Sequence, residues 1–219
     1  EQEIDFILST AGRYLSRKPR REDIRSVFAG LRPLAAPKRD GGGTKEISRS
    51  HKIMVSDSGL VTITGGKWTT YRRMAQDTVD RAIELGLVPS AECVTERLRI
   101  HGYRKGTDFA HELYVYGSDI ERVEALIDSS EANRRTLSPR FGFRAGQVVW
   151  AVREEMALHV EDVLARRFRA LFLDARAAKQ MARPVAEIMA AELGRDAEWV
   201  DRETEAFEKL ADGYLIDSF

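Results

Sequence analysis

Residues 59–73 read Gly-Leu-Val-Thr-Ile-Thr-Gly-Gly-Lys-Trp-Thr-Thr-Tyr-Arg-Arg and combine a strand, a turn and a helix start. The apolar run at residues 60–63 predicts a short strand, and Gly65 and Gly66 after it predict a turn. From Lys67 onward the apolar residues recur on one stripe, which is typical of an amphipathic helix. The stretch therefore predicts a strand–turn–helix unit.

The start of this helix has the composition of an anion-binding site. Gly65 and Gly66 let the backbone approach a ligand closely, and the first amides of a helix carry partial positive charge. Lys67 adds a cation, while Thr69 and Thr70 add hydroxyl groups. These residues indicate a binding site for a phosphate, a carboxylate or an anionic cofactor ring. The alternative is an ordinary strand-to-helix turn with a threonine cap.

Upstream of the strand, the pattern predicts a hairpin. Residues 50–56 have an alternating centre, in which Ile53 and Val55 face one way and Lys52 and Met54 the other, and the turn signal at residues 57–59 contains a glycine. Nearer the N-terminus, residues 3–16 have helical spacing, residues 26–31 favour a strand, and residues 35–46 have the composition of a flexible loop. We therefore expect a helix and short strands in this part of the chain.

Downstream, the helix after Lys67 is expected to stop at Gly86, and the character of the chain then changes. After a possible strand at residues 96–100, helical spacing dominates, with a break at residues 140–144. The expected helices cover residues 118–129, 145–158, 160–173, 175–193 and 198–210. The prediction is an α+β chain that is mainly α, with a hairpin followed by an all-helical bundle.

Composition limits the classes of function. The chain has 219 residues, 43% of them hydrophobic and 32% charged, which is typical of a soluble globular protein. Lys plus Arg equals Asp plus Glu, 35 each, so net charge gives no argument for nucleic acid as a partner. The single cysteine, Cys93, excludes an internal disulfide, and no apolar run is long enough to span a bilayer. The chain begins without methionine inside a helical pattern, so we expect a piece of a longer protein.

Other chemical motifs are missing or weak. The four histidines lack metal-ligand spacing, so no metal site is expected, and no Gly-x-Gly-x-x-Gly or Walker loop occurs. Arginine clusters such as Arg166 and Arg167 are expected to be solvated and paired with nearby acids. Arg32 and Arg49 differ, because each lies at the end of or just before a predicted strand. The planar guanidinium group suits phosphate or carboxylate, although a plain surface position is the alternative.

Five blocks, in order along nearly the whole chain, resemble the FAD-dependent glycerol-3-phosphate dehydrogenases. They are residues 28–34 (Phe-Ala-Gly-Leu-Arg-Pro-Leu), 47–53 (Ile-Ser-Arg-Ser-His-Lys-Ile), 58–75, 152–157 and 160–174. The resemblance implies that residues 1–86 are the C-terminal part of an incomplete FAD- and substrate-binding region, and that residues 87–219 are a helical cap domain. The family's N-terminal dinucleotide fold is absent, so we expect the isolated chain neither to hold FAD tightly nor to turn over.

The resemblance also assigns site residues. Gly65, Gly66, Lys67, Thr69 and Thr70 match the family's flavin-contacting block. The substrate arginines of the family correspond to Arg32 and Arg49. The catalytic base is unknown and is expected in the missing segment; His51 is a weak candidate because family members differ there.

The implied reaction moves a hydride from C2 of sn-glycerol 3-phosphate to flavin and yields dihydroxyacetone phosphate. Electrons then pass to a quinone, or to O2 in the oxidase relatives; a dehydrogenase is favoured because no sizeable oxidase insert is seen. The implied partners are the remainder of the enzyme chain and, as possibilities, a second copy and a membrane surface. The implied location is cytoplasmic, peripheral to the inner face of the cell membrane.

One alternative belongs to another functional class, that of non-catalytic interaction modules. In this alternative, residues 90–219 form a helical module that docks to a protein or a membrane. One departure from the family lies in this part, where Leu158-His159 replaces the frequent Arg-Thr before Val-Glu-Asp-Val-Leu. We expect this change to affect surface or partner contacts rather than chemistry.

Overall fold

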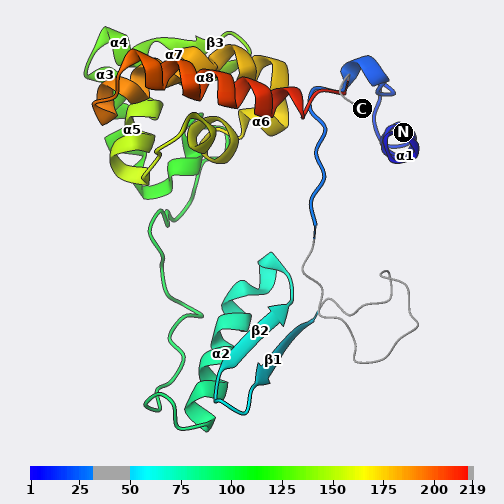
Figure 1. Ribbon diagram of the computed structural model, residues 1–219, viewed down its shortest axis with the longest axis vertical. Coiled ribbons are helices and arrows are strands. Elements are labelled where there is room, and N and C mark those ends of the chain that lie inside the picture. Colours follow the sequence, from blue (N-terminus) through cyan, green and yellow to red (C-terminus); the bar gives the residue numbers. More distant parts are fainter. Residues whose placement is uncertain (32–49, 217–219) are drawn as a thin grey trace. The chain divides into compact units, whose positions relative to one another are not determined.

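The computed structural model describes residues 1–31 and 50–216 (Figure 1). Its contacts divide the chain into two compact units. The helical unit comprises residues 1–29 and 102–219, and the hairpin unit comprises residues 30–101. This grouping differs from the sequence-based division after residue 86, because residues 1–29 pack with the helices. The division of the complete enzyme into domains at that residue stays a prediction.

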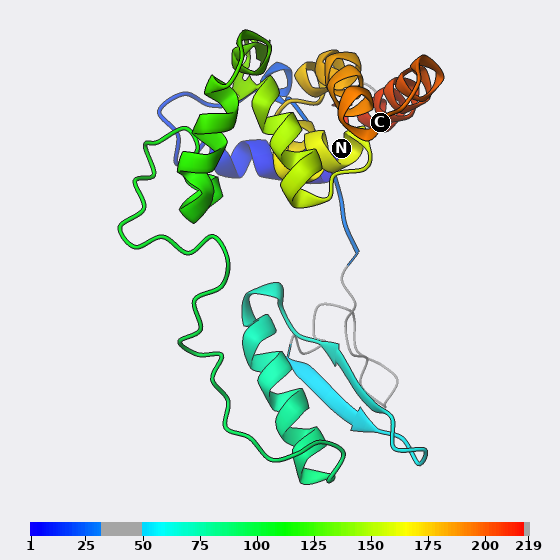
Figure 2. The same ribbon diagram turned by 90° about the vertical axis from the view of Figure 1, so that its left-hand side faces the viewer.

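The hairpin unit contains the predicted strand–turn–helix. Its elements are β1 (His51–Val55), β2 (Val61–Gly65), the 3₁₀ turn η3 (Trp68–Thr70) and α2 (Tyr71–Glu84). The strands are antiparallel, with His51 opposite Gly65 and Ile53 opposite Ile63. Figures 1 and 2 show α2 lying along this hairpin. Gly86, with φ 69°, follows the end of α2, as predicted from its position.

The hairpin unit has little interior. Among its described residues none is fully buried, and Met54, Leu60 and Trp68 are at least half exposed. A two-stranded hairpin covered by one helix buries too little apolar surface to form a core of its own. This unit therefore carries exposed apolar surface next to the predicted site.

The helical unit contains most of the regular structure. Its elements are α1 (Gln2–Ala11), η1 (Arg21–Asp23), η4 (Tyr114–Asp119), α3 (Ile120–Asp128), α4 (Glu131–Arg134), β3 (Thr136–Ser138), β4 (Phe141–Arg144), α5 (Ala145–Glu155), the π-helix η5 (Asp162–Arg167), α6 (Ala170–Leu173), α7 (Ala175–Leu193) and α8 (Ala197–Asp212). The described chain is thus mainly helical with two short antiparallel strand pairs. The predicted fold class is confirmed.

The core lies where α5, η5, α6, α7 and α8 meet. Its fully buried side chains include Val148, Leu164, Leu171, Met181 and Met189. In both views α7 and α8 lie side by side (Figures 1 and 2). Burial of these apolar side chains stabilises the bundle, as expected from the helical spacing.

Local capping explains the bounds of the two longest helices in this bundle. The Asp174 side chain accepts a hydrogen bond from the Ala177 amide at the start of α7, and Gly194 ends α7 with φ 63°. Asp196 caps α8 in the same way through the Trp199 amide. Acid caps and a left-handed glycine are the residues that such helix ends favour.

Two strand predictions are wrong. Residues 26–31 form no strand. Backbone groups at the start of this segment bond to helix ends instead: the Ala175 amide donates to the carbonyl oxygen of Arg25, just before the segment, and the Val27 amide donates to the Tyr214 carbonyl oxygen. Residues 96–100 are also irregular. Conversely, the predicted break at residues 140–144 contains β4, which pairs with β3.

Three predicted helices are shorter than expected. The helix expected at residues 3–16 ends at Ala11. The helix from residue 145 ends at Glu155, where Met156 has φ 56°, and the helix expected at residues 160–173 is divided between η5 and α6 by Arg169, with φ 57°. A left-handed residue cannot continue a right-handed helix. Among the described residues, no helix has the length and apolar composition needed to cross a membrane.

Candidate functional site

The turn between β2 and α2 requires both of its glycines. Gly65 and Gly66 have φ of 75° and 78°, a backbone conformation that other residues adopt only at a cost. A Cβ on Gly66 would lie 2.5 Å from Sδ of Met74 and 3.2 Å from Cβ of His51. The turn therefore packs its backbone directly against α2 and β1, and no larger residue fits without movement.

The residues after the turn leave the helix start open. Lys67, Trp68, Thr69 and Thr70 are all exposed, and Trp68 stacks on Tyr71 with ring centroids 5.6 Å apart. Among the described residues, no acid forms an ion pair with Lys67. The helix start is thus accessible to an anionic or electron-rich ligand.

Thr70 does not act as the threonine cap that was the alternative prediction. Its hydroxyl donates a hydrogen bond of 2.9 Å to the Lys67 carbonyl oxygen, and its amide donates to the same oxygen at 3.0 Å. Neither Lys67, the N-cap of η3, nor Thr70, the N-cap of α2, makes a side-chain cap bond. Thr70 therefore holds the 3₁₀ turn in shape, while Thr69 presents its side chain to solvent.

A polar cluster formed by His51, Arg73 and Asp77 lies next to this turn. It was not predicted from the sequence. Nε2 of His51 lies 2.9 Å from Oδ2 of Asp77, and Nε of Arg73 lies 2.8 Å from Oδ1 of the same carboxylate. Asp77 thereby ties β1 to α2. The i,i+4 spacing of Arg73 and Asp77 is visible in the sequence, but the contact of Asp77 with His51 is not. His51 has a structural partner here, which gives no support to a role as the base.

The two arginines predicted to bind substrate, Arg32 and Arg49, lie outside the described residues. The described part of the predicted site is therefore its cofactor half, residues 65–70, which one turn of chain brings together.

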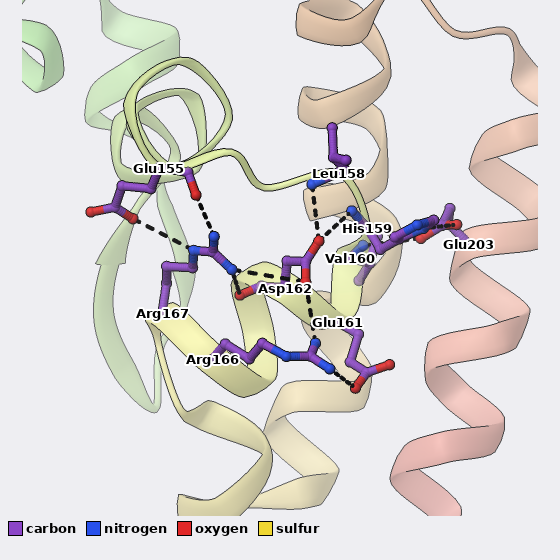
Figure 3. A network of polar contacts seen from close by, with 9 residues as sticks. All are labelled: Glu155, Leu158, His159, Val160, Glu161, Asp162, Arg166, Arg167 and Glu203. Carbon is purple, nitrogen blue, oxygen red and sulfur yellow. Dashed lines mark hydrogen bonds and ion pairs between the residues drawn. The ribbon is translucent and has the colours of Figure 1, made fainter. Parts of the chain in front are cut away.

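A second polar cluster lies in the helical unit, at the start of η5 (Figure 3). Oδ2 of Asp162 accepts hydrogen bonds of 3.0 Å from the Leu158 and His159 amides. Its other oxygen lies 3.2 Å from Nη1 of Arg166, which also pairs with Glu161 at 2.7 Å. Asp162 thus satisfies amides at the entry to the π-helix that lack helical partners.

Arg167 lies deeper in the same cluster. Its guanidinium group donates to the carbonyl oxygens of Asp162 and Glu155, and Nε lies 3.8 Å from the Glu155 carboxylate. The Trp150 indole donates to that carboxylate at 3.2 Å, and burial raises the pKa of Glu155. The partners of Arg166 and Arg167 shown here belong to this chain, in agreement with the structural role expected for both.

Glu203 joins this cluster to α8. Its carboxylate accepts a hydrogen bond of 3.0 Å from the Val160 amide and lies 2.9 Å from Nδ1 of His159 (Figure 3). The hydrogen bond to Glu203 raises the pKa of His159. The position where the chain departs from the family pattern therefore makes an internal contact between the residues just before η5 and α8.

Comparison with known proteins shows the family. The family model described as the C-terminal domain of alpha-glycerophosphate oxidase matches residues 60–200. The chain belongs to this family. The matched region begins at β2, so it includes the open helix start at residues 65–70 as well as most of the helical unit.

Relatives that match most of this chain include glycerol-3-phosphate dehydrogenases. The chain is 38% identical to the mitochondrial glycerol-3-phosphate dehydrogenase SDP6 of Arabidopsis thaliana, over 88% of this chain and 35% of that protein. It is 36% identical to glycerol-3-phosphate dehydrogenase 2 of Mycobacterium tuberculosis, over 92% of this chain and 37% of the relative. The sequence resemblance is thereby confirmed, and the chain spans about a third of the length of these relatives.

Proposed function

We propose that this chain is the C-terminal part of an FAD-dependent glycerol-3-phosphate dehydrogenase, which oxidises sn-glycerol 3-phosphate to dihydroxyacetone phosphate. The observation that carries this proposal is the family match over residues 60–200, which includes the open helix start at residues 65–70. The relatives' names supply the substrate.

The residues at this helix start fit a flavin. When bound, FAD accepts the hydride from C2 of the substrate. Gly65 and Gly66 are partly exposed and carry no side chain, Lys67 carries a positive charge, and Thr69 offers a hydroxyl. Among the described residues, Lys67 has no acid partner. We assign these groups to the electron-rich edge of the ring, where positive potential favours the negative charge that develops on reduction. Thr70 keeps the turn in place through its bonds to Lys67.

Arg32 and Arg49 are proposed to bind the substrate phosphate or to orient the polyol. Charge-assisted hydrogen bonds from guanidinium to phosphate are worth about 1.5–3 kcal/mol each. In the complete enzyme, Arg32→Ala is therefore expected to lower kcat/KM for glycerol 3-phosphate by roughly 10- to 100-fold. Arg166→Ala, which removes an exposed arginine paired with Glu161, is the matched control and should leave kcat/KM unchanged. An unchanged value for Arg32→Ala would remove the role assigned to Arg32.

A quinone is the proposed electron acceptor. We further propose that the complete enzyme contacts the inner face of the cell membrane peripherally and that it forms a homodimer. The family description names an oxidase, so O2 is the competing acceptor. Hydrogen peroxide formed in step with glycerol 3-phosphate consumption in air would favour the oxidase. Reduction of a soluble quinone analogue without peroxide would favour the dehydrogenase.

The isolated chain is proposed to be inactive. The residues that we assign to the flavin belong to one turn, which is too small a surface to hold a dinucleotide cofactor tightly. A purified chain of residues 1–219 should show far less flavin absorbance than a complex with one flavin per chain would show. Copurification of one flavin per chain would contradict this part of the proposal.

A further inference from the structure

The Asp77 carboxylate joins a residue of β1 to a residue one turn earlier on α2. Its Oδ2 atom lies 2.9 Å from Nε2 of His51, and its Oδ1 atom lies 2.8 Å from Nε of Arg73. Because a carboxylate only accepts hydrogen bonds, Nε2 of His51 carries the hydrogen. The side chains of His51 and Asp77 are 23% and 25% exposed, so their contact is partly withdrawn from water. We call His51, Arg73 and Asp77 the Asp77 cluster.

The Asp77 cluster borders the glycine turn at the helix start. His51 is opposite Gly65 in the register of β1 and β2, and Cβ of His51 would lie 3.2 Å from a Cβ on Gly66. The other two members of the cluster are the third and seventh residues of α2. With a rise of about 1.5 Å per residue, they lie about 5 Å and about 10 Å along the helix from its N-cap, Thr70. The cluster and the helix start belong to the same unit, so these separations are set within it.

The charges near the helix start are a balance of cations and acids. Residues 67–73 contain three cations, Lys67, Arg72 and Arg73. Among the described residues, Lys67 has no acid partner, whereas Arg72 lies 3.9 Å from Glu96 and Arg73 lies 2.8 Å from Asp77. The shorter of these two ion pairs is the one that contains Asp77. The Asp77 carboxylate therefore offsets part of the positive potential that the cations create at the helix start.

We propose that the Asp77 cluster tunes the reduction potential of the flavin, with Arg73 raising the potential and Asp77 lowering it. This inference rests on the proposed function, in which residues 65–70 face the electron-rich edge of the ring. Positive potential at that edge stabilises the negative charge of the reduced flavin, and a nearby carboxylate opposes this effect. His51 is a positioning residue, because its hydrogen bond holds the Asp77 carboxylate on the side of β1. Each charge acts through space, so its effect decreases with distance and is screened by salt over about 8–10 Å.

The test measures the flavin midpoint potential of the complete enzyme by anaerobic titration against redox dyes. Arg73→Gln removes a positive charge and Asp77→Asn removes a negative charge, and each variant breaks the same ion pair. The matched controls are Arg81→Gln and Glu84→Gln, because these residues form an ion pair of the same length, 2.8 Å, on the same helix. That pair lies about 16–21 Å along α2 from Thr70, which is farther than the screening length.

We expect the two variants of the cluster to shift the potential in opposite directions. At the wild-type midpoint, where half of the flavin is reduced, Arg73→Gln should lower the ratio of reduced to oxidised flavin by about threefold. Asp77→Asn should raise this ratio by about threefold, and the double variant should lie near the wild type. Both shifts should grow at low ionic strength. Hydrogen exchange at the start of α2 should become faster in both single variants, because both lose the ion pair.

Three results would overturn the inference. Shifts in the same direction in Arg73→Gln and Asp77→Asn would mean that the pair only holds the turn in shape. An unchanged potential in Arg73→Gln, whose side chain is 59% exposed and carries the least risk to folding, would mean that the cluster does not act on the flavin. Equal shifts in the Arg81→Gln and Glu84→Gln controls would remove the dependence on distance.

Lys67→Met in the same titration separates a failure of this inference from a failure of the proposed function. If Lys67→Met lowers the potential and the variants of the Asp77 cluster do not change it, only the role of the cluster fails. If Lys67→Met leaves the potential unchanged, the flavin does not lie at the helix start, and the inference fails with the proposed function.

Discussion

The amide of Val27 donates a hydrogen bond of 2.8 Å to the carbonyl oxygen of Tyr214, so the N-terminal segment is bonded to the residues that follow α8. Residues 1–29 are therefore part of the helical unit, although the hairpin unit separates them from it in sequence. The helical unit is complete only when both ends of the chain contribute.

Removal of residues 1–29 should destabilise the helical unit. The deletion loses three hydrogen bonds worth about 1 kcal/mol each and the ring contacts of Phe28, worth about 1 kcal/mol. We expect the thermal transition of the remaining helices, followed by circular dichroism, to move down by on the order of 10 °C. Deletion of residues 1–20 alone, which removes α1 and its exposed surface, is the control. Equal effects of the two deletions would contradict the role of residues 25–28.

Gly66→Ala tests the close packing of the turn. The substitution adds a Cβ at positive φ and places it 2.5 Å from Met74, so we expect a loss of about 2–4 kcal/mol. Gly59→Ala is the matched control, because Gly59 has φ 82° but no atom within 4 Å of the added Cβ. It should cost only about 1 kcal/mol. Hydrogen exchange across β1, β2 and α2 measures the loss of stability in each variant. Equal losses in Gly66→Ala and Gly59→Ala would show that packing against Met74 is unimportant.

The hairpin and α2 were predictable because their signals are local. Alternating side chains, the glycine turn and Gly86 act over a few residues, and residues 65–70 come together because they are consecutive. The bonds of residues 25–27 run to helix ends more than 140 residues away, and a strand pattern does not reveal such partners. The same limit hid the contact between His51 and Asp77, which joins β1 to α2.

The division of residues 160–173 was not predictable from helical spacing either. The apolar residues Val163, Leu164 and Leu171 are buried as expected. The interruption comes from Arg169 in a left-handed conformation and from the contacts of Arg167 with carbonyl oxygens of Glu155 and Asp162. These contacts depend on tertiary structure, which overrides local propensity.

The contact of His159 with Glu203 should make stability depend on pH. The pKa of folded His159 is raised, mainly by the Glu203 hydrogen bond and further by Asp162 and Glu161. A raised pKa means that the contribution is fully present below the unfolded value of about 6.5 and is lost as pH rises through the folded pKa. Since His159 is largely exposed, we expect less than about 1 kcal/mol.

The measurement compares urea unfolding of the wild type, His159→Gln and Glu203→Gln between about pH 5.5 and 8.5. The wild type should exceed His159→Gln in stability at the acid end and approach it at the alkaline end. Glu203→Gln keeps an acceptor for the Val160 amide but removes the charge, so its stability should vary less with pH. A difference that grows with rising pH would have the wrong sign for this account.

The most direct test of the central claim is anaerobic reduction of the flavin by glycerol 3-phosphate in the complete enzyme with Lys67→Met. Lys52→Met, an exposed lysine on β1, is the control. If the helix start at residues 65–70 stabilises the reduced flavin, Lys67→Met should slow reduction at least about tenfold and lower the flavin midpoint potential. The Lys52→Met enzyme should match the wild type. An unchanged rate and potential in Lys67→Met, with full flavin content, would contradict the account.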